Sequence, residues 1–135
     1  MTSTRGEKVA IAIASAVAIL FGLATVFSGG QALFGDAEAR AAVGDAVPFV
    51  LWFNFTAGFA YVLAGAGLSL RRPWAVGLAV AISATTILVF LAFGVHVLRG
   101  GAYETRTVGA MALRSLVWIA IAAVAVRAVP WRRRS

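Results

Sequence analysis

Two arginines in the last third of the sequence are the side chains most able to bind a ligand. Arg106, Ala110 and Arg114 step by four residues, so they lie along one face of a helix. Arg114 stands inside the apolar run MALRSLVW, where an ionised group costs about 2.5–3.5 kcal/mol at mid-span of a membrane. Two guanidinium groups on one face repel each other unless an anion or a carboxylate lies between them. The spacing predicts either a structural arginine, paired with a carboxylate or carbonyl or snorkelling to the surface, or an anion-binding arginine.

A buried amide and several polar or aromatic neighbours extend this candidate site. Asn54 lies about two turns into the run that begins at Pro48, at a depth that matches Arg114 to within a turn. Because a buried amide needs hydrogen-bond partners, Asn54 either joins helices or faces Arg114 across a cavity. The predicted ligand site takes in Asn54, His96, Arg106, Met111, Arg114 and Trp118, with Tyr61, Tyr103, Glu104 and Thr107 in supporting places.

No set of residues in the sequence predicts catalysis or metal binding. His96 is the single histidine and there is no cysteine, whereas a zinc site needs three or four protein ligands. Ser115 follows Arg114 without a base beside it in the sequence, so a serine triad has no support. We therefore predict no catalytic residue, no metal and no bound cofactor. A quinone, or a haem held by His96 and Met111, stays open as an alternative.

The elements that position these residues are four long apolar runs. The 135-residue chain has a mean hydropathy of +0.92 and is only 13% charged, against about 25% in soluble proteins. Each run reaches the roughly 20 residues that span a bilayer core, which predicts helices over about 9–27, 47–70, 73–98 and 107–129. Because most connections are short, neighbouring helices should be antiparallel. The sequence predicts one all-α transmembrane domain over residues 1–135, an up-down-up-down four-helix bundle.

The connection after the first run is the longest one and carries turn signals. Gly29 and Gly30 predict the end of the first helix. Asp36 is placed to cap a short helix over about 36–43, which we expect to lie on the outer membrane surface. The first apolar run is also longer than the 7–15 residues of a signal-peptide core, so we expect it to stay as a helix.

The basic residues predict the orientation in the membrane. The net charge is +7, but these residues flank apolar runs, which favours lipid over nucleic acid as the partner. The termini and the second loop carry Arg5, Lys8, Arg71, Arg72, Arg127, Arg132, Arg133 and Arg134, against Arg40, Arg99 and Arg106 in the other two loops. This bias places both termini in the cytoplasm. An alanine-rich composition with arginine in excess of lysine indicates a bacterium with a GC-rich genome, hence a multi-pass protein of the inner (plasma) membrane.

Two stretches, FSGGQALFGD and FNFTAGFAYVLAGAGLSLRRPWAVGLAVAI, give the chain a resemblance to a known group. Between about Ala18 and Ile82 it resembles the DoxX-like group of small four-helix bacterial membrane proteins. The resemblance implies association with redox or quinone-linked membrane complexes. It carries over no functional residue, and the segment GGAYETRTVGAMALRS has no counterpart in that group.

Three functions follow from these observations. Small residues recur at four-residue spacing, as in Ala10, Ala14, Ala18 and Gly22, which is typical of helices that pack closely in lipid. With no catalytic set, we expect a non-enzymatic accessory or interaction subunit that forms a homo-oligomer or joins a membrane complex. The alternative is a protein that binds an anionic or quinone-like small molecule in a pocket of the outer half. A redox accessory protein of the DoxX-like kind is the third.

Overall fold

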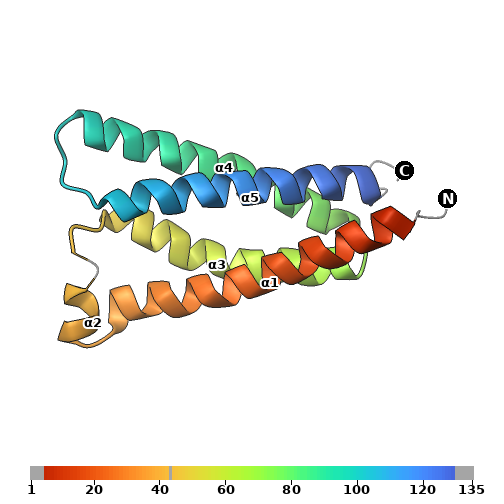
Figure 1. Ribbon diagram of the computed structural model, residues 1–135, viewed down its shortest axis with the longest axis horizontal. Helices are drawn as coiled ribbons and strands as arrows, with labels where there is room; N and C mark the ends of the chain where they lie inside the picture. The colour runs from red at the N-terminus through yellow and green to blue at the C-terminus, as the bar shows by residue number, and fades with distance from the viewer. Residues whose placement is uncertain (1–4, 43, 130–135) are drawn as a thin grey trace.

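Four long helices and one short helix make up the protein (Figure 1). The computed structural model describes residues 5–42 and 44–129. The long helices are α1 (Arg5–Phe34), α3 (Pro48–Ser69), α4 (Pro73–Leu98) and α5 (Thr105–Ala128), and α2 (Ala37–Ala41) joins the first two. All four are long and apolar enough to cross a membrane, and the described residues contain no strand. This confirms an all-helical protein with four candidate membrane spans.

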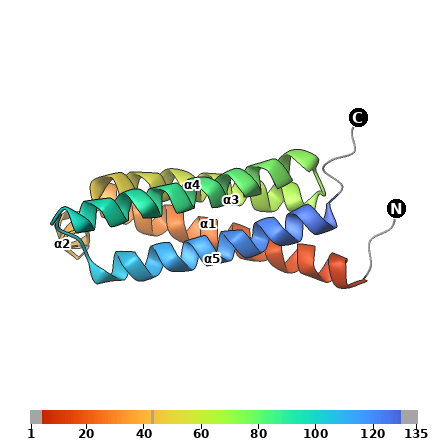
Figure 2. The same cartoon turned by 90° about the horizontal axis from the view of Figure 1, so that it is seen from above.

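The long helices form a closed ring in which each one packs against two neighbours. α1 packs against α3 and α5, and α4 packs against the same two helices from the opposite side. Consecutive long helices run in alternate directions, as Figures 1 and 2 show. The start of α1 and the end of α5 lie at one end of the bundle, and α2 lies at the other. We refer to the latter as the α2 end.

Local sequence signals set several of the helix boundaries. Pro48 and Pro73 occupy the first turns of α3 and α4, where the missing N–H has no helical partner to lose. At the end of α4, Gly100 adopts a φ of 82°, and the Gly101 N–H donates to the His96 carbonyl at 2.9 Å. That pairing is the usual glycine C-cap of a helix. The observed bounds of α3, α4 and α5 lie within two residues of the predicted ranges 47–70, 73–98 and 107–129.

The first helix differs from the prediction, because Gly29 and Gly30 do not end it. α1 begins at Arg5 and continues to Phe34, past the predicted end at residue 27. Gly29 is buried against α3, where an added Cβ would lie 3.1 Å from the Phe55 Cβ. A helical glycine costs about 1 kcal/mol relative to alanine, and this close contact between helices offsets the cost. Gly29 therefore serves packing rather than a turn.

The predicted short helix is present, capped as expected. Asp36 precedes α2, and its Oδ1 accepts a hydrogen bond from the Ala39 N–H at 2.8 Å. α2 ends at Ala41, before the predicted end at residue 43, and Val43 itself lies outside the described residues. The basic tail Arg132 to Arg134 also lies outside them.

Close approach of α1 and α3 organises the core. A Cβ added to Gly22 would lie 2.7 Å from the Gly58 carbonyl oxygen, so the two backbones meet directly at this level. Such small-residue contacts replace the hydrophobic effect as the source of helix association in lipid. Next to this contact, Tyr61 and Trp118 are fully buried with their ring centroids 4.8 Å apart. The aromatic pair lies directly beneath the polar site described next.

Candidate functional site

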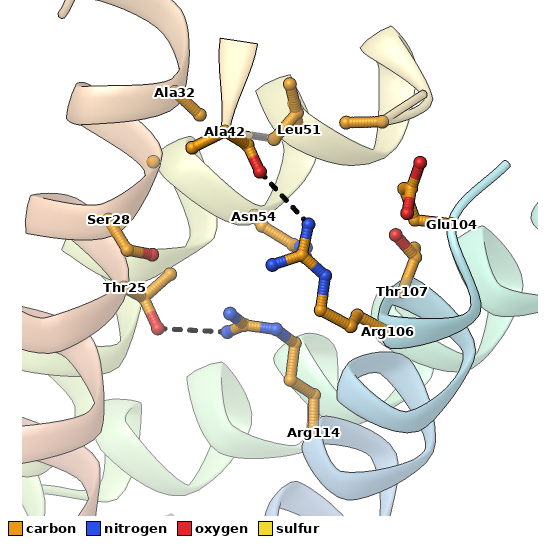
Figure 3. Close-up of a pocket in the computed structure, with 12 residues that line it drawn as sticks. Thr25, Ser28, Ala32, Ala42, Leu51, Asn54, Glu104, Arg106, Thr107 and Arg114 are labelled. Carbon is orange, nitrogen blue, oxygen red and sulfur yellow. Dashed lines mark hydrogen bonds between the residues drawn. The ribbon is translucent and has the colours of Figure 1, made fainter. Parts of the chain in front are cut away.

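A cavity of about 340 Å³, with several polar and charged side chains on a largely apolar wall, opens at the α2 end, between α1, α3 and α5 (Figure 3). We name it the arginine cavity after its two cationic side chains. Its polar lining residues are Thr25 and Ser28 of α1, Asn54 of α3, Glu104 just before α5, and Arg106, Thr107 and Arg114 in the first half of α5. Ligand pockets range upward from about 300 Å³, so the volume suits a small molecule or a head group.

Arg114 forms the floor of the cavity and is almost fully buried. It is 9% exposed and lies nine residues after Thr105, about 14 Å along α5. Its Nη1 donates to the Thr25 Oγ1 at 2.9 Å and to the Tyr61 hydroxyl at 3.3 Å. These bonds turn the guanidinium inward to α1 and α3, so Arg114 does not snorkel along lipid.

Aromatic faces complete the surroundings of this guanidinium. Its Cζ lies 5.0 Å from the Phe21 ring centroid and 5.9 Å from that of Tyr61, within the range of a cation–π contact. Its Nε is buried without a hydrogen-bond partner. Within the described part of the chain, Arg114 forms no salt bridge. Hydroxyls and rings therefore surround the positive charge, and no carboxylate of these described residues lies within salt-bridge distance of it.

Arg106 and Glu104 hold a backbone segment at the edge of the cavity. We name Ala42 and residues 44–46 the strap, because Ala42 and Ala46 also line the cavity. The Arg106 Nη2 donates to the Ala42 carbonyl at 3.1 Å, and the Glu104 Oε2 accepts from the Asp45 N–H at 2.8 Å. Glu104, which the sequence predicts in a supporting place, thus has its carboxylate directed to the strap.

Asn54 lines the same cavity with an unsatisfied amide. It is half-buried, and its Oδ1 is buried without a hydrogen-bond partner. A buried, unpaired polar group costs about 1–3 kcal/mol. Asn54 and Arg114 thus share one cavity, as one of the two sequence-based alternatives expected. Figure 3 shows both arginine side chains and Asn54 converging on the space next to Thr25 and Ser28.

The structure does not bring His96 into this cavity. His96 lines a separate hollow with Phe49 and Arg99, and its Nε2 is hydrogen-bonded to the Ala102 carbonyl at 2.8 Å. The physical reason is the ring order of the helices: α4 is opposite α1, so a residue at its end cannot reach the space between α1 and α5. Tyr103 is also elsewhere, with its ring edge against Phe93 at 6.0 Å between centroids.

Met111 and Trp118 are core residues and do not line the cavity. Met111 is fully buried in a small apolar cluster with Val47, Val50 and Phe93. Trp118 lies one turn deeper than Arg114, against Tyr61, and belongs to the main core. Because Met111 lies in this cluster and His96 lies by Ala102, the two residues do not share one site. In the part of the chain that is described, no group of three His, Cys, Asp or Glu residues could hold a metal ion.

Sequence reasoning missed the contribution of α1. Thr25 bonds directly to Arg114, Ser28 lines the cavity beside it, and Phe21 packs against the guanidinium. A usable signal was present, because Thr25 and Ser28 are hydroxyl residues three positions apart on one face of an apolar helix. The predicted helix end at residue 27 hid it, since Ser28 then fell into a loop.

The charges on the cavity wall favour an anion. Arg106 and Arg114 contribute two positive charges and Glu104 contributes one negative charge.

A comparison of the chain with protein-family models, curated proteins and solved structures finds no match. The resemblance to the DoxX-like group therefore stays a prediction, and the geometry of the arginine cavity carries the functional argument.

Proposed function

We propose that this protein is a multi-pass membrane protein that binds a small anionic molecule in the arginine cavity. The observation that carries the proposal is Arg114: a guanidinium that is 9% exposed, lines a cavity and has no salt bridge within the described residues. An unneutralised buried charge is costly. Two hydroxyl bonds and two ring contacts recover part of that cost, and a bound anion would recover the rest.

Arginine is well suited to this task. The planar guanidinium offers five donors in a fixed fork and pairs with carboxylate or phosphate through two parallel hydrogen bonds. In Arg114, Nη1 is occupied by Thr25 and Tyr61, which fixes the plane of the fork before a ligand arrives. Such preorganisation improves affinity because less freedom is lost on binding.

The proposed setting is a bacterial inner membrane, with the α2 end on the outer side and both termini in the cytoplasm. The support is the arginine and lysine bias of the loops. In this orientation the arginine cavity opens to the outer side, and α2, whose described residues are largely exposed, lies at the outer membrane surface. We propose no catalytic role, and the accessory-subunit and redox-accessory roles remain predictions from the sequence.

Co-purification tests the proposal. The wild-type protein, Arg114→Met and Arg99→Met are extracted in mild detergent, and mass spectrometry identifies small anions released on denaturation. Arg99 is the matched control, because it removes one exposed positive charge at the same end of the bundle without touching the cavity. We expect an anion in the wild type and in Arg99→Met, and its loss in Arg114→Met. Equal amounts in all three would sink the proposal, and a stoichiometric protein partner with no anion would favour the accessory-subunit role.

A further inference from the structure

A second hollow, of about 400 Å³, lies between α1 and α5. Its walls are entirely apolar, with Ala14 and Val17 on the α1 side and Val117, Ala120 and Ile121 on the α5 side. We name it the apolar groove. Ala120 and Val17 are exposed, so the groove is open at the molecular surface that faces lipid.

The apolar groove and the arginine cavity share α1 and α5 as walls but no described lining residue, and the groove lies further from the α2 end. Ala14 lies eleven residues before Thr25, which places both on nearly the same face of α1, about 16 Å apart. Ile121 lies seven residues after Arg114, again on nearly the same face, about 10 Å further along α5. Along α1, the half-buried Phe21 lies between Val17 of the groove and Thr25 of the cavity, and its ring contacts the Arg114 guanidinium. The line between α1 and α5 thus passes from cationic to apolar over a few turns.

Loose packing of α1 against α5 leaves room for a ligand along this line. Of the four pairs of neighbouring long helices, these two make the least contact. Helices in lipid associate through close contact of small residues, and here alanines on both helices line an open groove instead.

We infer that the ligand of the arginine cavity is a single-chain phosphate amphiphile, with its head between Arg106 and Arg114 and its hydrocarbon chain in the apolar groove. The inference rests on the proposed function and names the ligand class. A phosphate monoester carries about −1.5 to −2 charges at pH 7, so it can pair with both guanidinium groups, whereas a single carboxylate carries one charge. The third charge on the wall, Glu104, is hydrogen-bonded to the strap. The hydrocarbon chain of the ligand also explains how it reaches the site. A molecule dissolved in the bilayer can move sideways between the helices to a site about 14 Å along α5.

The groove and the head site can be blocked separately. Ala120→Phe fills the groove from α5, and Val17→Trp fills it from α1, in case one of the two variants folds poorly. Ala84→Phe is the control, because Ala84 is an exposed alanine on α4, which takes no part in either hollow. The protein is placed in phosphatidylcholine nanodiscs, and native mass spectrometry measures the dissociation constants of dodecyl phosphate and ethyl phosphate.

The expected result is that either groove variant weakens dodecyl phosphate binding about tenfold, as loss of contact with four or five carbons implies. Ethyl phosphate binding should not change in these variants, and Ala84→Phe should change neither. Arg114→Met should abolish binding of both phosphates. If the groove variants leave dodecyl phosphate unaffected while Arg114→Met abolishes both, the head binds alone and the inference is wrong, but the proposed function stands. If Arg114→Met leaves both phosphates bound, the proposed function fails as well.

Discussion

At the scale of single residues, the arginine cavity contains polar groups that the fold leaves unsatisfied. The Asn54 Oδ1 and the Arg114 Nε are both buried without hydrogen-bond partners, which costs about 1–3 kcal/mol for each group. Thr86 shows the opposite case, since its buried hydroxyl donates to the Ile82 carbonyl one turn earlier. Apolar residues at positions 54 and 114 would remove these unsatisfied groups. Three further side-chain atoms are also buried without partners and do not line the cavity: the hydroxyls of Ser15 and Ser115 and the Trp118 Nε1. What indicates a binding site is therefore that Asn54 and Arg114 line one shared cavity.

The variant Asn54→Leu distinguishes a role of Asn54 in stability from a role in ligand binding. The change replaces an unsatisfied amide with an apolar side chain of similar size, which is close to neutral or stabilising. We therefore expect an unchanged or higher thermal unfolding temperature in nanodiscs. Loss of one hydrogen-bonding group should weaken dodecyl phosphate binding by about two- to tenfold. Thr56→Val, at an exposed position of the same helix, should change neither quantity. A large drop in unfolding temperature would instead mark Asn54 as a structural link between helices.

At the scale of elements, glycines in the long helices have two different roles. Gly22 is at the α1–α3 contact, where an added Cβ would lie 2.7 Å from a backbone oxygen of α3. Gly77 is an exposed residue of α4 with nothing within 4 Å of its added Cβ. The same residue type therefore holds two helices together in one place and only lowers helix propensity in the other.

The two glycines predict opposite effects of alanine. Gly22→Ala should lower the free energy of unfolding by about 1–3 kcal/mol, because the backbones must move apart. Gly77→Ala should raise it by about 0.5–1 kcal/mol through helix propensity alone. Thermal unfolding of both variants in the same nanodiscs measures the difference. Equal effects of the two substitutions would contradict the α1–α3 contact.

The strap requires a glycine at position 44, just as the α1–α3 contact requires one at position 22, because an added Cβ would clash at either position. Gly44 has a φ of 67°, and its added Cβ would lie 2.6 Å from the Glu104 Oε2. Gly44→Ala should therefore break the bond from the Asp45 N–H to Glu104 and release the strap. Hydrogen exchange would show faster exchange of the Asp45 amide, with little change in the helices. Ala41→Gly, at an exposed end of α2, should leave that amide protected. An unchanged rate in Gly44→Ala would show that Glu104 does not hold the strap.

At the scale of the whole molecule, sequence reasoning succeeded where the signal is local or periodic. Apolar runs of bilayer length predicted the four candidate spans, and Asp36 predicted the cap of α2, because hydropathy and capping depend on neighbours in sequence. The predicted end of α1 was wrong because the role of Gly29 depends on its close contact with Phe55, a residue on another helix. Arg114, Arg106 and Asn54 were found as unusual polar residues in apolar surroundings. His96 was assigned to the same cavity from its depth, and Met111 and Trp118 from their depth and their positions flanking the Arg106 and Arg114 face. Neither depth nor helical spacing fixes which neighbour a helix face meets.

The orientation of the whole bundle gives the last prediction. The loop at Leu70 and the strap region lie at opposite ends of the molecule (Figure 1). Because the chain has no cysteine, Ala41→Cys and Leu70→Cys each introduce a single thiol at an exposed position. If the positive-inside bias sets the orientation, a membrane-impermeant maleimide should label Ala41→Cys in intact cells of a bacterial host. It should label Leu70→Cys only after the membrane is permeabilised. The reverse pattern would place the arginine cavity on the cytoplasmic side, where its anion would come from the cytoplasm or the inner leaflet.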